Sequence, residues 1–376
     1  MNEQEILYTM ALTQLPGLGI ASQRLLLDAM GSATAIYEHR NHIREALPEA
    51  GARISEALSQ MDDKLQRAEK ELAFCKKKRI TCLHIQSEDY PLRLRSCPDA
   101  PPLLFHRGST PLNTPHIVSI VGTRRITEYG KETCREFIRE LRQLCPDTLI
   151  VSGLAYGVDI HCHRAALEEG MDTVGILAHG LDQIYPRMHR EVAVRMVEQG
   201  GLLTEFMTGT NADKKNFVQR NRIVAGISDA TIVVESAIKG GSLITAELAD
   251  GYHRDVFAFP GRIRDKYSEG CNSLIRNNKA ALITNAREFV EAMQWETVAK
   301  RSKSLPDGIQ QCLFPDLTED EQKIVNSLVG TDGKQINLIT IETGIPIGLL
   351  SSMLFTLEMK GMVKMLSGSK YKLTRG

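Results

Sequence analysis

The strongest constraint on the fold is a series of short apolar runs in the middle of the chain, separated by segments with helical spacing. The runs cover residues 116–122, 148–152, 173–178, 201–205, 230–235 and 255–259, with 280–284 as a candidate further run. Strands that alternate with helices form a parallel sheet covered by helices on both faces. The sequence therefore predicts an α/β domain built on a parallel sheet.

Other regions flank this domain. Residues 1–65 have helical spacing, and residues 301–316 are polar and contain prolines, as linkers do. Residues 317–376 contain three helical segments and a short hairpin around Gly368, which is the pattern of a winged helix. We thus expect a helical domain at 1–65, the α/β domain at 66–300, a linker and a winged helix.

The first region contains the stretch LTQLPGLGIASQRLLLDAMGS, in which two helices flank a glycine turn at Gly17 and Gly19. This helix-hairpin-helix pattern leaves backbone N–H groups open beside a helix N-terminus, where they can bind phosphate. Similar glycine turns also serve as ordinary loops. Accessory phosphate contact and a plain turn therefore both stay open for Gly17 and Gly19.

The charge balance limits where a nucleic acid could bind. The chain has 46 basic and 46 acidic residues, so any such site must be a local patch. The N-terminus lacks the basic region of a secretory signal, and no apolar run approaches the ~20 residues of a membrane span. We expect a cytoplasmic protein whose eight cysteines, which include no CxxC pair, form no disulfides.

A metal site is not expected. The triplet His161-Cys162-His163 has no second cluster that would complete a four-ligand site. His163 lies one turn beyond Asp159, so the two side chains could share a hydrogen bond. Nothing in the spacing of Asp159, Glu205, Glu235 and Glu247 singles out a pair of catalytic carboxylates.

Glycines and cations collect after the predicted strands. Since ligands of open parallel sheets bind beyond the carboxyl ends of the strands, these segments predict a phosphate-binding edge. The candidate residues are Arg124 and Arg125 after the first run, Gly153 after the second, Lys215 after the fourth, and Lys239, Gly240, Gly241 and Ser242 after the fifth.

The segment FVQRNRIVAGIS leads into the fifth predicted strand and places Arg220, Asn221 and Arg222 at the front of a helix. Guanidinium and amide groups there would supply forked donors to phosphate and flat faces to bases. The alternative is a buried structural network, in which Arg or Asn side chains cap loops. Phe217 follows the apolar spacing of this helix and is predicted to belong to the core rather than to stack on a base.

The usual nucleotide motifs are missing. The Walker A pattern GxxxxGK[ST] is absent, and the first strand is not followed by GxGxxG. A nucleophile elbow GxSxG does not occur either. No nucleotide cofactor is therefore expected.

Five motifs in this order closely resemble the DNA-processing protein A family, DprA, also called Smf. They are SIVGTRRITEYG, VSGLAYGVDIHCHRAAL, FVQRNRIVAGIS, KGGSLITAELA and VFAFPG. The resemblance covers nearly the whole chain. One departure is visible in the loop after the third strand, where Ala178-His179 replaces the usual glycine.

The resemblance implies an extended Rossmann fold that binds single-stranded DNA, protects incoming strands during natural transformation and loads the RecA recombinase. It implies a homodimer formed through the Rossmann domain and no established catalytic activity. By the same resemblance the DNA site would include Arg124, Gly153, Arg220, Asn221, Arg222, Lys239 and Ser242, with Arg125 and Lys215 as additions.

Two other classes of function remain as alternatives. KGGSLITAE loosely resembles the PGGxGTxxE motif of nucleotide phosphoribohydrolases, in which Glu247 would be the surviving acid. A transcription regulator could use the winged helix. The recognition-helix candidate IPIGLLSSMLFTLEMKG contains no Arg, Asn or Gln, and Leu349, Leu350 and Leu354 follow a spacing that predicts core positions. We therefore expect a degenerate winged helix.

Overall fold

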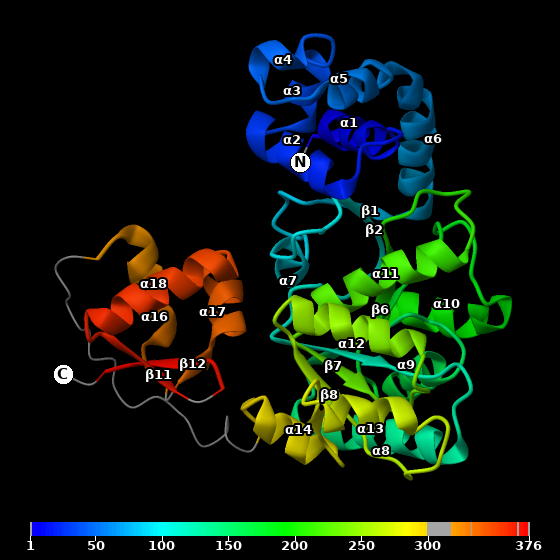
Figure 1. The fold of residues 1–376 in the computed structure, drawn as a ribbon, viewed down its shortest axis with the longest axis vertical. Helices are drawn as coiled ribbons and strands as arrows, with labels where there is room; N and C mark the ends of the chain where they lie inside the picture. The colour runs from blue at the N-terminus through cyan, green and yellow to red at the C-terminus, as the bar shows by residue number, and fades with distance from the viewer. Residues whose placement is uncertain (1, 299–316, 332, 367, 375–376) are drawn as a thin grey trace.

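The computed structural model describes residues 2–298, 317–331, 333–366 and 368–374, so the whole of the linker predicted at 301–316 lies outside the described residues. The N-terminal helices stand at the top of Figure 1 as a separate layer. They are α1 (Glu3–Thr13), α2 (Ile20–Met30), α3 (Ala33–Glu38), α4 (Ile43–Ala46), α5 (Ala52–Ser59) and α6 (Asp62–Lys78). The domain boundary predicted at residues 65 and 66 falls inside α6, so a division at that point stays a prediction.

The middle of the chain forms a nine-stranded sheet with the order β1-β2-β6-β5-β4-β3-β7-β8-β9. Its strands are β1 (Thr81–His84), β2 (Leu103–Gly108), β3 (His116–Val121), β4 (Thr148–Ser152), β5 (Thr173–Ile176), β6 (Gly200–Thr204), β7 (Ala230–Val233), β8 (Asp255–Ala258) and β9 (Ala281–Leu282). The strands from β3 to β9 pair in parallel, which confirms the predicted parallel sheet. The pair β1 and β2 was not predicted and adds an antiparallel edge to β6.

The helices of this domain are α7 (Leu92–Arg95), α8 (Glu128–Leu144), α9 (Val158–Glu168), the short 3-10 helix η1 (Arg187–His189), α10 (Arg190–Glu198), α11 (Lys214–Gly226), α12 (Gly241–Gly251), α13 (Glu269–Arg276) and α14 (Ala286–Ala292). Helices α11 and α12 cover one face of the sheet, and α8, α9 and α14 cover the other (Figure 1). Every residue of β3 is buried, as expected for a central strand between two helical layers.

The strand order reverses at β3. From β3 the chain moves through β4 and β5 to β6 on one side, and then crosses back to place β7 on the other side of β3. In open α/β sheets such a reversal opens a crevice at the carboxyl ends of the two strands. The loops after β3 and β7 are therefore the part of this fold most suited to hold a ligand.

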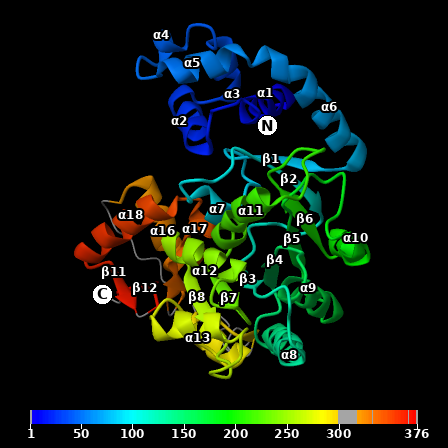
Figure 2. The same ribbon diagram turned by 45° about the vertical axis from the view of Figure 1, so that its right-hand side comes forward.

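The C-terminal unit contains α16 (Glu319–Leu328), α17 (Ile336–Thr343) and α18 (Ile347–Met359), with a small sheet of β10 (Lys334–Gln335), β11 (Val363–Leu366) and β12 (Lys370–Leu373). These elements confirm the predicted winged helix. The unit lies beside the sheet domain in both ribbon views (Figures 1 and 2), and Asn337 Nδ2 donates to Asp229 Oδ1 at 3.0 Å across the contact. Leu350 and Leu354 are buried as predicted, but Leu349 is 52% exposed, so its predicted core position is wrong.

Within the described ranges no single helix is long and apolar enough to cross a membrane. Only α17 and α18 taken together meet the length and composition of a span, and the two helices are bent by 108°.

Candidate nucleic-acid interface

The loop after β3 is held against the loop after β7 by backbone and side-chain hydrogen bonds. Thr123 N donates to Glu235 O at 2.6 Å, and the Glu235 carboxylate accepts from Thr127 N at 2.9 Å. Val158 N donates to Thr123 O at 3.1 Å and so ties the start of α9 to the same loop. These bonds fix the backbone around Arg124 while its side chain stays exposed.

A glycine is required where the loops after β3 and β4 meet. Gly157 has a φ of +79°, and a Cβ at this position would lie 2.0 Å from Thr123 O. Any side chain would therefore combine a left-handed backbone with a steric clash. Gly157 is thus what allows the two loops to approach each other.

Asp159 organises the loop after β4 from below. Its Oδ2 accepts from Gly153 N at 3.1 Å and from Ala155 N at 3.3 Å. Burial raises the pKa of Asp159 above its ordinary value, while the Arg220 charge and the two N–H donors act in the opposite direction. Asp159 therefore positions the loop, and it does not bond to His163 as the spacing had suggested.

His163 instead lies in the core under this loop. Its Nδ1 is 2.7 Å from Thr173 Oγ1, and complete burial lowers the pKa of His163 to about 3. Among the residues that the structure describes, no group of three or more His, Cys, Asp or Glu side chains is placed to hold a metal ion.

The start of α11 supplies one wall of the crevice. Asp213 caps the helix by accepting from Asn216 N at 2.8 Å. One face of the helix then presents Lys214, Phe217 and Asn221, which are spaced three and four residues apart. The Arg124 guanidinium lies 4.9 Å from the centre of the Phe217 ring. This half-buried ring faces the crevice, so the prediction that Phe217 belongs only to the core is wrong.

The start of α12 supplies the opposite wall. Gly240 precedes the helix and offers no capping side chain, so the first N–H groups of α12 are available to an anion. Ser242 Oγ donates to Ser236 Oγ at 2.8 Å and is buried, whereas Lys239 is exposed. Gly241 has open space where a Cβ would lie.

Together these walls enclose a cavity of about 590 Å³, which we call the loop pocket. Its lining includes the predicted residues Arg124, Arg220, Asn221, Lys239, Gly240, Gly241 and Ser242, together with Thr123, Lys214 and Phe217. Lys214 was missed by the sequence reasoning, although it stands one residue before the predicted Lys215 and three before Phe217.

Arg220 lines the loop pocket, but its main task is to hold the surrounding backbone in place. Its Nη1 donates to Gly153 O at 2.6 Å and also to Ile176 O, and only 4% of the residue is exposed. Burial lowers the pKa of Arg220 to about 10, so the group remains protonated at neutral pH. A Cβ on Gly153 would lie 2.4 Å from the Arg220 guanidinium, which explains the glycine and places Gly153 beneath the pocket lining.

Several predicted residues lie elsewhere. Arg222 points to the other side of α11, where it forms a buried ion pair with Glu205 and donates to Asp99 O, so it is not a pocket residue. Lys215 also lies outside the loop pocket. Arg125 is exposed and does not line the pocket. Gly17 and Gly19 lie in the α1–α2 turn, apart from the pocket.

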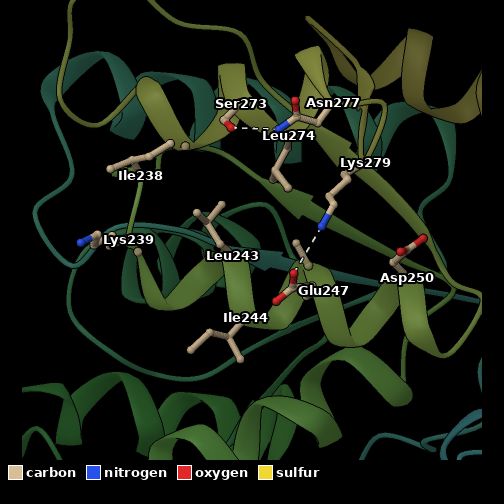
Figure 3. Close-up of a pocket in the computed structure, with 13 residues that line it drawn as sticks. Ile238, Lys239, Leu243, Ile244, Glu247, Asp250, Ser273, Leu274, Asn277 and Lys279 are labelled. Carbon is tan, nitrogen blue, oxygen red and sulfur yellow. Dashed lines mark hydrogen bonds and ion pairs between the residues drawn. The ribbon is translucent and has the colours of Figure 1, made fainter.

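Another cavity, of about 370 Å³, is lined by α12 and α13 (Figure 3) and shares Lys239, Gly240 and Ile244 with the loop pocket. It contains Glu247, whose Oε1 lies 3.3 Å from Lys279 Nζ. Lys239 extends away from Glu247 in this view. Glu247 is therefore held at the surface by a lysine and does not line the loop pocket.

The chain is similar to several known proteins over most of its length. Residues 81–294 match the family model of DNA recombination-mediator protein A, and residues 314–369 match that of the DprA winged helix domain. Protein Smf of Escherichia coli is 33% identical over 296 residues, which cover 77% of this chain and 76% of that protein. DNA processing protein DprA of Bacillus subtilis is 37% identical over 243 residues, which cover 64% of this chain and 80% of that protein.

Two solved structures are also similar. The X-ray structure of DNA processing protein A from Streptococcus pneumoniae has a TM-score of 0.65 and 30% identity, and the match covers 76% of this chain and 97% of that one. DNA processing protein A from Helicobacter pylori, described for its unique single-stranded DNA binding mode, has a TM-score of 0.52 and 32% identity. That match covers 57% of this chain and 96% of the other.

Proposed function

Because the chain belongs to the DNA recombination-mediator protein A family, we propose that it is a DNA-processing protein that binds single-stranded DNA in the loop pocket. The observation that carries the proposal is the convergence of exposed cations, a half-buried aromatic ring and an open helix N-terminus in a chain of zero net charge. The similarity to a protein of Helicobacter pylori that is described for its single-stranded DNA binding supports it.

Each group has a distinct task in this proposal. Arg124, Lys214 and Lys239 neutralise phosphates, and the N–H groups at the start of α12 bind a phosphate oxygen. Phe217 offers its ring face to a base, and Asn221 donates or accepts a hydrogen bond beside it. Contacts to phosphates and to ring faces carry little sequence information, so binding is expected to be independent of sequence.

The proposed role of the bound DNA in the cell, and the proposed homodimer, rest on the family resemblance. We propose that the protein protects incoming strands and loads RecA during natural transformation, in the cytoplasm. It acts as a homodimer formed through the Rossmann domain. The edge strand β9 supports a homodimer, since it carries Leu282, which is 49% exposed. Gly17 and Gly19 are proposed as accessory phosphate contacts, and Arg125 as a contact outside the pocket.

We propose no catalytic activity. A phosphoribohydrolase would need its surviving acid, Glu247, beside a bound nucleotide phosphate. Glu247 is 69% exposed in the neighbouring cavity and paired with Lys279. Release of free base from nucleoside monophosphates, abolished by Glu247→Gln, would support the enzyme instead.

The proposal is tested by binding of one labelled sequence as a single strand and as a duplex across a range of salt concentrations. We expect a clear preference for the single strand. The logarithm of the affinity should fall with the logarithm of salt concentration by roughly 0.7 for each phosphate neutralised. Equal affinity for the duplex, or an affinity that salt does not change, contradicts the proposal.

A further inference from the structure

Apart from the loop pocket and the cavity beside Glu247, a third cavity lies on the other side of α11, between the α1–α2 turn and the loop that joins β6 to α11. We call this cavity of about 660 Å³ the hairpin groove. Gly19 and Gln23 line it from the helical layer, Phe206 and Thr208 from the loop, and Lys215 and Gln219 from α11. Its volume falls within the range of sites that hold small ligands.

Helix α11 is the ridge between the two hollows. Lys214, Phe217 and Asn221 line the loop pocket, whereas Lys215 and Gln219 line the hairpin groove. Adjacent residues of a helix point about 100° apart, which is how one short segment serves both cavities. A helix with its side chains is only about 10–12 Å across. A short run of nucleotides is therefore long enough to span the ridge.

The hairpin groove repeats the chemistry of the loop pocket. Both hollows combine an exposed lysine, a partly exposed phenylalanine and a primary amide. In the groove these are Lys215, Phe206 and Gln219. This set suits a phosphate and a stacked base, which are the groups that single-strand binding proteins contact.

Among the described residues, the one acid in the groove lining is already paired with a cation. This acid is Glu205, which pairs with Arg222, and Glu71 behind the loop lies 2.8 Å from Arg67. Arg67 also donates to Thr208 O at 2.6 Å, which holds the loop wall in place. The exposed Lys215 is therefore left as an available positive charge facing the groove.

We propose that the hairpin groove is a second nucleotide subsite, which receives the part of the same DNA strand that continues from the loop pocket over the start of α11. This inference rests on the proposed single-strand binding. It predicts that a strand long enough to cross α11 contacts the helical layer, whereas a short strand contacts the loop pocket alone.

Gly19 allows a test that leaves the fold intact. It precedes α2 with a φ of −70° and no capping side chain, and a Cβ there would meet nothing within 4 Å. Gly19→Asp adds a good helix cap and a negative charge at the groove wall, and Gly19→Asn adds the neutral cap of the same size. Gly51 is the matched control, since it precedes α5 with a φ of −65°, no capping side chain and the same open space.

The experiment measures the affinity of the full chain for oligothymidylates of about 4 and about 16 nucleotides, which bracket common site sizes. For Gly19→Asp we expect roughly tenfold weaker binding of the long strand. We also expect a salt slope smaller by about 0.7 and unchanged binding of the short strand. Gly19→Asn adds the same bulk without the charge, so it should weaken binding of the long strand less than Gly19→Asp does. Gly51→Asp, which lies outside both cavities, should bind both strands as the unmodified protein does.

Two results overturn the inference. If Gly19→Asp binds the long strand as well as the unmodified protein, the strand does not enter the groove, although single-strand binding itself stands. If the unmodified protein binds neither strand, the proposed function fails, and the inference fails with it.

Discussion

Arg124 and Arg222 are both candidates for DNA contact by sequence, but their surroundings in the structure predict opposite consequences of replacing them with alanine. Arg124 is exposed over the Phe217 ring, and no carboxylate among the described residues forms an ion pair with it. Losing a charge-assisted contact to phosphate costs about 1.5–3 kcal/mol. That loss corresponds to a roughly 10- to 150-fold higher Kd for single-stranded DNA. The free energy of unfolding should change by less than about 0.5 kcal/mol, because the side chain is at the surface.

Arg222→Ala should instead destabilise the fold. The side chains of Arg222 and Glu205 are each only 7% exposed, so the alanine variant leaves a buried carboxylate without its cation. Breaking such a buried pair costs about 3–5 kcal/mol. Burial already raises the pKa of Glu205, so the carboxyl would take up a proton more readily once the arginine is gone.

The assay combines urea unfolding with fluorescence anisotropy on a labelled single strand at a temperature where each variant is folded. We expect Arg124→Ala to unfold at the same urea concentration as the unmodified protein but to bind the strand more weakly. We expect Arg222→Ala to unfold at a lower urea concentration, while its folded molecules bind the strand with unchanged affinity. Replacing both Arg222 and Glu205 with apolar residues should recover part of the lost stability. An Arg222→Ala variant that is as stable as the unmodified protein but binds DNA poorly refutes the reasoning.

Three further predictions follow from the same geometry. Gly241→Val should fold normally yet weaken DNA binding, because its side chain would occupy open space in the loop pocket; Gly348→Val, at an equally open position in α18, is the control for both unfolding and binding. Burial lowers the pKa of His163 from 6.5 to about 3, so its contribution to stability is present above pH 6.5 and is lost as pH falls toward 3. Between pH 7 and pH 5 the unmodified protein should lose about 2 kcal/mol more unfolding free energy than His163→Gln, and equal losses would contradict this. Removing residues 316–376 should leave most single-strand affinity in place, and a hundredfold loss in a folded protein would make the winged helix a principal DNA contact.

The parallel sheet could be predicted because its strands are buried on both faces. β3 and β4 are continuous apolar runs ended by glycine-containing loops, and such runs are visible without any other information. The position of the loop pocket followed from the rule that ligands bind at the carboxyl ends of parallel strands. β1 and β2 were not predicted because they lie outside the alternation of strands and long helices: among the described residues only the four-residue α7 stands between them, and they pair antiparallel at the edge of the sheet.

The side chains of α11 could not be assigned from the sequence. Helical spacing separates faces, but it does not say which face meets a cavity, and α11 has a hollow on each side. The spacing therefore predicts Phe217 in the core and Arg222 at the DNA, whereas in the structure Glu205, distant in sequence, holds Arg222 in an ion pair. Leu349 was misplaced for a related reason, since α18 is apolar around most of its circumference and leaves Phe355 exposed as well.

The most direct test of the account is to find where a bound strand touches the protein. A photoreactive pyrimidine in a single-stranded oligonucleotide would be crosslinked to the full chain, and the modified peptides would be identified by mass spectrometry. Because Phe217 is the aromatic ring that faces the loop pocket, we predict that the main crosslink falls on the peptide that contains it. Crosslinks confined to the winged helix, for example at Phe355 or Tyr371, would contradict the claim that the loop pocket binds the DNA.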